Sequence, residues 1–195
     1  MKNKVLLFCG FVLLFFGCSS VPPEKPPVRV PDAILGPGVL SSRELAAFLL
    51  NNNPALEKEF ADEFAKIYVA EAAIEGINHD VAFSQMCVET GFLTFGGLVT
   101  ADMNNYSGIG SIGPGQPGER FASPRIGVRA QIQHLKAYAT TEPPKQFIVD
   151  PRYHLVRLGA APTIDGLAGT WAADREYGVK IKTMLRRLYA SRGRV

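Results

Sequence analysis

Residues 79–92 read HDVAFSQMCVETGF, and this stretch decides the fold. It predicts a helix over about residues 79–90. Most of the circumference of that helix is apolar, with Val81, Ala82, Phe83, Met86, Cys87 and Val88. A helix that is apolar nearly all round is a buried one, and a glycine such as Gly91 is the usual residue after a helix end. We therefore expect this helix at the centre of a mainly α-helical domain.

One carboxyl group stands at the end of this apolar helix. Glu89 has Gln85 and Met86 one turn earlier on its face, and no Lys or Arg occurs between Lys66 and Arg120. Burial and the negative end of a helix dipole both raise the pKa of a carboxyl group. A carboxyl group that keeps its proton near neutral pH can protonate a glycosidic oxygen. The alternative, on these grounds alone, is a solvent-exposed glutamate at a helix end.

The other helices follow from apolar spacing, caps and prolines. Ser41 and Glu44 form the pattern of a capping box, and Ser123-Pro124 places a proline at a first helical position. We expect these helices over about residues 41–51, 56–75, 124–140, 164–171 and 174–191. The glycine-rich residues 93–120 lack helical periodicity. They predict a small irregular or β-hairpin lobe that forms one wall of a cleft beside Glu89.

The first residues have the pattern of a secretory signal. Lys2 and Lys4 precede a short apolar run, which ends at Gly17-Cys18. That run is shorter than the ~20 residues that a membrane-spanning helix needs. Gly17-Cys18 resembles a bacterial lipobox, so we expect residues 1–17 to be removed and Cys18 to be lipidated. The alternative is an ordinary signal peptide with an incidental cysteine.

A proline-rich segment follows the cysteine. Residues 18–38 contain PPEKPP, which favours extended polyproline geometry, so residues 19–31 span up to about 40 Å at about 3.1 Å per residue. We expect 18–38 to be a tether and 39–195 to be the catalytic domain. A leader without a spacing role is the alternative.

Charge and cysteine content exclude several classes of function. Loss of residues 1–17 removes two lysines and changes the formal net charge from +3 to +1. No basic stripe remains for nucleic acid, and Cys87 alone cannot make a disulfide framework. His79, His134 and His154 lack the spacing of a helical metal site. We expect a monomer without metal or cofactor.

Four ordered blocks resemble a known family. They are HDVAFSQMCVETGF (79–92), NNYSGIG (104–110), FASPRIGVRAQIQHLKAY (121–138) and LAGTWAADREYGVKI (167–181). Together they resemble the bacterial cell-wall glucosaminidases over about residues 60–188. This resemblance implies a lysozyme-like fold and an endo-β-N-acetylglucosaminidase that cuts peptidoglycan.

The resemblance also implies roles for individual residues. Glu89 falls on the position of the family's general acid. Asn105, Tyr106 and Gly108 fall on a segment that contacts the sugar. Tyr177 would face Glu89 across the cleft, where its hydroxyl group orients the sugar or a water molecule, with core packing as the alternative.

The resemblance leaves two points open, the place of Trp171 and the identity of a second carboxylate. Trp171 belongs to the same block as Tyr177, and we expect it to pack in the core. A second carboxylate is the other open point, with Asp102 and Glu119 as the candidates. Either would activate water for inversion if it stood roughly 6.5–9.5 Å from Glu89, although Glu119 also has Arg120 beside it as a simple ion-pair partner. Without such a group, the substrate's own N-acetyl group attacks the anomeric carbon.

The sequence therefore predicts a lipid-anchored peptidoglycan hydrolase of the cell envelope. It would face the periplasm or the wall, bind glycan strands, and cleave the bond after N-acetylglucosamine. A lytic transglycosylase is the first alternative, because it shares the fold and the single glutamate. A non-catalytic wall-binding lipoprotein is the second, and an interaction module without glycan contact is the third.

Overall fold

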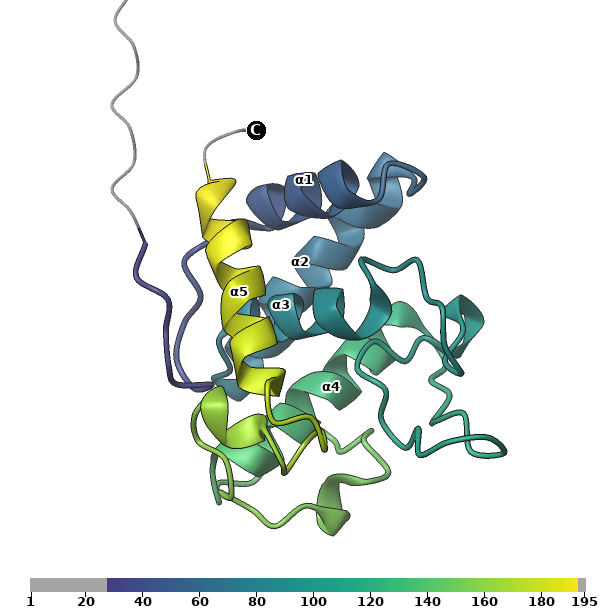
Figure 1. Cartoon of the computed structure of the whole chain (residues 1–195), viewed down its shortest axis with the longest axis vertical. Helices are drawn as coiled ribbons and strands as arrows, with labels where there is room; N and C mark the ends of the chain where they lie inside the picture. Colours follow the sequence, from purple (N-terminus) through teal and green to yellow (C-terminus); the bar gives the residue numbers. More distant parts are fainter. Residues whose placement is uncertain (1–27, 193–195) are drawn as a thin grey trace, which may run out of the picture.

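A computed structural model describes residues 28–192 of the chain (Figure 1). Its architecture is mainly helical, as expected. The α-helices of these described residues are α1 (Ser42–Asn52), α2 (Lys58–Glu75), α3 (His79–Thr90), α4 (Pro124–Ala139) and α5 (Tyr177–Ala190). Single turns of 3₁₀ helix lie in the connections between them: η1 (Ala101–Met103), η2 (Tyr153–Leu155) and η3 (Asp165–Leu167).

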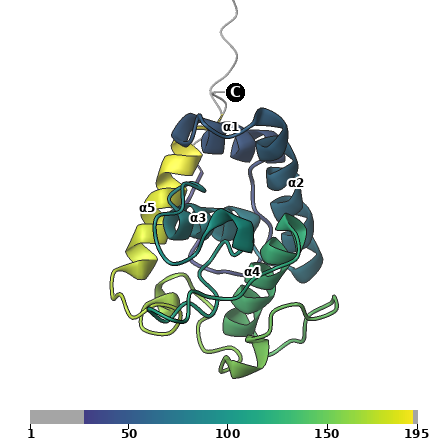
Figure 2. The same cartoon turned by 90° about the vertical axis from the view of Figure 1, so that its right-hand side faces the viewer.

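The helix α3 lies in the middle of the domain. It packs against α2, α4 and α5, and Figure 2 shows these helices and α1 around it. Val81, Ala82, Phe83 and Met86 have no exposed surface. The apolar circumference read from the sequence therefore does mark the central helix.

The helix ends also follow the local sequence. Ser41 and Glu44 form the expected capping box, in which the Ser41 hydroxyl group accepts from the Glu44 backbone N–H at 3.3 Å. Asn78 caps α3 by accepting from Asp80 N at 3.0 Å. Gly91 ends α3 with a φ of 57°, a left-handed conformation that glycine adopts without a steric cost. This end fixes where Glu89 lies.

The glycine-rich lobe is irregular. Between α3 and α4 it contains η1 and an isolated bridge between Gly113 and Gln116. The sequence left two forms open, an irregular lobe and a β-hairpin lobe. Residues 93–120 form the irregular one. Asn105 braces it, because its side-chain amide donates to Ile109 O at 2.9 Å and to Glu119 O at 3.0 Å.

Three boundaries differ from the expected ones. The segment before α1 already packs on the domain, since Ile34 is fully buried and donates to Pro162 O at 3.1 Å. Residues 32–36 of the expected tether are thus part of the folded unit. The helix expected over 164–171 is only the short turn η3, and α5 begins at Tyr177 instead of 174. Irregular pairing of this kind leaves no periodic pattern in a sequence.

The expected signal peptide (1–17) and the lipidated Cys18 lie outside the described residues. Within residues 28–192, no helix has the length and apolar character needed to span a bilayer.

Candidate active site

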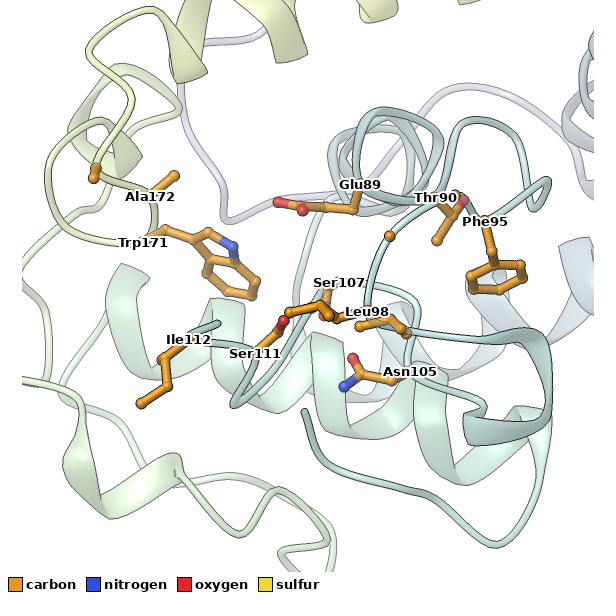
Figure 3. A pocket seen from close by; sticks show the side chains of 15 residues that line it. Glu89, Thr90, Phe95, Leu98, Asn105, Ser107, Ser111, Ile112, Trp171 and Ala172 are labelled. Carbon is orange, nitrogen blue, oxygen red and sulfur yellow. The ribbon is translucent and has the colours of Figure 1, made fainter. Parts of the chain in front are cut away.

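A cleft of about 590 Å³ runs between the glycine-rich lobe and the loop before α5 (Figure 3). The lobe contributes residues from Phe95 to Ile112, and the loop contributes residues 171–173. Glu89 is the only ionisable side chain among the described residues that line this cleft. Any acid–base chemistry performed by a cleft side chain therefore falls to Glu89.

Two aromatic residues hold the Glu89 carboxyl group. Tyr177, the first residue of α5, donates a short hydrogen bond from its hydroxyl group to Glu89 Oε1. Trp171 also forms a side-chain hydrogen bond with Glu89, and the indole nitrogen is turned toward the carboxyl group in Figure 3. Because α3 and α5 pack against each other, residues 88 positions apart in sequence meet at this point.

The environment raises the pKa of Glu89 above its ordinary value of 4.5. Glu89 is an exposed residue that faces the open cleft, but protein atoms surround its carboxyl group, and this desolvation is the largest cause of the rise because it disfavours the charged form. The hydrogen bonds from Tyr177 and Trp171 oppose this rise without cancelling it. The carboxyl group thus combines a raised proton affinity with a fixed orientation, which suits a general acid.

The raised pKa also predicts how stability depends on pH. The folded state binds the Glu89 proton more tightly than the unfolded state does. Its contribution to stability is therefore complete below the ordinary pKa and is lost as pH rises through the folded pKa. Wild type should therefore lose stability between about pH 4 and about pH 8, whereas Glu89→Gln cannot titrate and should not show this loss. The melting temperature of the variant minus that of wild type should thus be larger at about pH 8 than at about pH 4. Thermal unfolding of both proteins at these two pH values measures this, and a constant or shrinking difference would contradict it.

The backbone directly after Glu89 is strained. Phe92, Leu93 and Phe95 have φ values of 59°, 63° and 48°, in the left-handed region that non-glycine residues rarely adopt. Two side chains hold this turn: Asn53 donates to Phe92 O at 2.8 Å, and Thr90 Oγ1 accepts from Leu93 N at 2.9 Å. Strain of this type collects at functional sites, where the surrounding structure supports it.

A model of the glucosaminidase family, described as mannosyl-glycoprotein endo-beta-N-acetylglucosaminidase, matches residues 65–190. This chain belongs to the glucosaminidase family. The match includes Glu89, Trp171 and Tyr177, so the cleft lies within the matched region. Family membership assigns the chain to the glycoside hydrolases.

The chain is also similar to individual proteins, one by sequence and two by fold. An uncharacterized protein of Borreliella burgdorferi is 41% identical over 152 residues, which cover 78% of this chain and 74% of that protein. Two crystal structures of autolysin E from S. aureus share the fold with a TM-score of 0.51, at 14% and 13% identity. Each alignment covers 86% of this chain and 74% of the autolysin chain. One holds the muropeptide NAM-L-Ala-D-iGlu, and the other is a catalytic mutant with the disaccharide NAG-NAM.

The predicted sugar-contact segment meets the glucosaminidase cleft at some of its residues. Asn105 and Gly108 line the cleft, and a Cβ atom on Gly108 would lie 3.7 Å from Glu89 Oε2. Tyr106 is instead buried behind this wall, and its hydroxyl group donates to Asn104 Oδ1 at 3.1 Å. Ser107 also lines the cleft, and no side-chain partner satisfies its buried hydroxyl group.

The two candidates for a second carboxylate do not line the cleft. Asp102 is an exposed residue whose pKa is lowered first by a hydrogen bond from Thr100 and then by its ion pair with Arg120 at 2.6 Å. Glu119 pairs with Arg152 at 3.5 Å instead of with its neighbour Arg120. Both carboxylates thus face arginine partners outside the set of cleft-lining residues.

Trp171 contacts both the core and the cleft, and its sequence pattern did not indicate the second contact. It packs against the core, as expected, but it also lines the cleft. His134 meets its ring edge-to-face at 4.8 Å, and His134 Nδ1 lies 2.6 Å from Asp150 Oδ2. The indole is therefore held from behind by a paired histidine. No group of three potential metal ligands occurs within residues 28–192.

Proposed function

We propose that this glucosaminidase hydrolyses peptidoglycan at the bond after N-acetylglucosamine, with Glu89 as the general acid. The observation that carries this proposal is a carboxyl group that stands alone among the described residues of the cleft lining. Desolvation raises the pKa of this Glu89 carboxyl group, and Tyr177 holds its Oε1. The autolysin E structures, which hold peptidoglycan fragments, support the choice of substrate.

The proposed reaction uses the substrate's own acetamido group. Glu89 gives its proton to the glycosidic oxygen while the acetamido oxygen attacks the anomeric carbon, so the leaving sugar departs with a hydroxyl group. The Glu89 carboxylate then takes a proton from water, which opens the cyclic intermediate and leaves a reducing end with retained configuration. This route is favoured because the cleft holds no second ionisable side chain among its described lining residues.

The same observation favours one second candidate, a lytic transglycosylase. In that reaction the 6-hydroxyl group of the sugar replaces water as the nucleophile, so one carboxyl group again suffices. The products differ, because a 1,6-anhydro end forms in place of a reducing end.

We further propose that the mature protein is a monomer anchored by lipidated Cys18. The segment between Cys18 and Val28, where the chain begins to pack against the core, would then hold the domain away from the membrane, and the cleft would reach glycan strands in the envelope. Ser19 and Ser20 directly follow the cysteine, and the outer membrane is the expected location in a cell that has one.

Mass spectrometry of fragments released from purified sacculi tests the proposed function. After borohydride reduction, we expect fragments that end in reduced N-acetylglucosamine, and a release by Glu89→Gln that is slower by about 10³-fold. Fragments with a 1,6-anhydro end would establish the transglycosylase instead. Cosedimentation with sacculi without any sugar release by wild type would refute both reactions and favour a wall-binding protein.

A further inference from the structure

A chain of hydrogen bonds connects Glu89 to Tyr68 of α2, in the core of the domain. Tyr68 OH donates to Gln131 Oε1 at 2.6 Å, and Gln131 Nε2 donates to Gln85 Oε1 at 2.8 Å. Gln85 Nε2 then donates to the Tyr177 hydroxyl oxygen at 3.0 Å, and Tyr177 donates to Glu89 Oε1. The chain thus crosses α2, α4, α3 and α5, and its first three residues have no exposed surface.

A backbone carbonyl group sets the direction of every bond in this chain. Gln131 Nε2 also donates to Ala82 O at 2.9 Å. A carbonyl oxygen only accepts, so the NH₂ group of Gln131 must face Ala82 and Gln85. Gln85 must then turn its oxygen to Gln131 and its NH₂ group to Tyr177. The Tyr177 oxygen accepts that bond and directs its own hydrogen to Glu89.

We propose that Gln85 and Gln131 are positioning residues that keep the acid proton of Glu89 on Oε2. Because Tyr177 donates to Oε1, that oxygen faces a hydrogen already and is a poor place for the acid proton. Oε2 is the oxygen beside Gly108, a residue of the cleft wall. The chain therefore directs the proton to the side where a glycosidic oxygen binds. The catalytic meaning of this arrangement rests on the proposed function.

The location of the two glutamines supports a role beyond packing. Both lie in the apolar interior, where an unpaired amide group is costly and each must find partners for its donors and acceptor. Aliphatic side chains at both positions would avoid that requirement. A connected polar network in a core rigidifies the groups it joins, and this one ends on the carboxyl group of the cleft.

Gln131→Glu reverses the chain without a change of shape. The new carboxyl group carries at most one hydrogen where the amide carried two, so it cannot serve both Ala82 O and Gln85 Oε1. Gln85 is then expected to flip and offer its oxygen to Tyr177. Tyr177 turns its hydrogen to Gln85, and the Glu89 proton moves to Oε1, away from the cleft. Loss of a donor to the carboxylate also raises the pKa of Glu89.

Gln133→Glu is the matched control. Gln133 lies on the same helix and is fully buried, but it donates to Phe147 O at 3.0 Å and accepts from Val149 N at 2.8 Å. It has no bond in the chain to Glu89. Both variants place an isosteric carboxyl group in the core of α4, so the control measures the general cost of that change.

The decisive readout is the titration of the Glu89 carboxyl carbon by carbon-13 NMR, with the pH profile of hydrolysis beside it. For Gln131→Glu we expect the pKa of Glu89 to rise by about one unit. The alkaline limb of the pH–rate profile should move to higher pH by the same amount. We also expect kcat to fall about tenfold with KM unchanged. Gln133→Glu should keep the wild-type pKa and limb. A wild-type pKa in folded Gln131→Glu would overturn the proposal.

A second variant keeps the test open if Gln131→Glu does not fold. Gln85→Met keeps the side-chain length and removes the donor to Tyr177, which leaves the Tyr177 oxygen free to accept the Glu89 proton. The pKa of Glu89 should again rise, and in a Tyr177→Phe background the same substitution should leave it unchanged. Equal shifts in both backgrounds would overturn the proposal. The NMR titration does not depend on glycan cleavage. A wild-type protein that releases no sugar would therefore refute the proposed function, and the NMR titration would still test the role of the two glutamines.

Discussion

Glu89→Gln is expected to lower kcat on peptidoglycan by about 10³-fold, the middle of the range for loss of a general acid. KM should change little, because the glutamine oxygen still accepts from Tyr177 and the cleft keeps its shape. The measurement is the initial rate of reducing-end release from purified sacculi at several substrate concentrations. An activated aryl glycoside, whose leaving group needs no proton, should recover most of the lost rate if the chain accepts it.

Glu119→Gln is the control for this change. Glu119 pairs with Arg152 near the surface, and a surface ion pair contributes only about 0–1 kcal/mol. We expect its kcat to stay within about twofold of wild type, since this residue does not line the cleft. A loss as large as that of Glu89→Gln would show that Glu119 is the second carboxylate after all, and would contradict the acetamido route. A wild-type rate for Glu89→Gln would end the assignment of the general acid.

Gly127→Ala is expected to destabilise the domain by about 3 kcal/mol or more, which lowers the melting temperature by about 10 °C. A Cβ atom at this position of α4 would lie 1.8 Å from the backbone oxygen of Asn104. That oxygen cannot move alone, so α4 and the lobe would have to separate. The higher helix propensity of alanine than of glycine stabilises the variant by only about 1 kcal/mol. The steric cost is larger, so the net effect is destabilising.

Thermal unfolding with Gly97→Ala as the control measures this effect. Gly97 has open space where a Cβ atom would stand and does not have a left-handed φ. Its substitution should change the melting temperature by a few degrees at most, in line with other surface substitutions of about 0.5 kcal/mol. Gly127→Ala should also lower kcat, because the displaced segment carries Asn105 and Gly108 of the cleft wall. Equal melting temperatures for the two variants would contradict the close packing of α4 on the lobe.

The sequence predicted the helices well where local chemistry decides them. The apolar circumference of residues 79–90 marked α3 as the central helix, and Gly91 and the Ser41–Glu44 box marked helix ends. It failed where pairing is irregular. Residues 32–36 bind the domain through backbone hydrogen bonds at Pro162, Gly76 and Asn78, and such contacts have no periodic signature.

The site was predicted in the same uneven way. Glu89 stood out because a carboxyl group at the end of an apolar helix is unusual, and its raised pKa has the expected cause. Trp171 and Gln131 gave no such signal, since an aromatic residue and a glutamine look ordinary in their local sequence. Gln131 meets Gln85 across 46 residues of chain, so only the packing of α3 on α4 reveals the connection.

The most direct test of the central claim is the titration of Glu89 in the wild-type protein. Carbon-13 NMR of the glutamate carboxyl carbons assigns its signal by comparison with Glu89→Gln. We expect a pKa above the ordinary value of 4.5, because desolvation of the carboxyl group outweighs the hydrogen bonds from Tyr177 and Trp171. A pKa at or below 4.5 would mean that this carboxyl group holds its proton no better than an ordinary glutamate does, and would contradict its role as a proton donor.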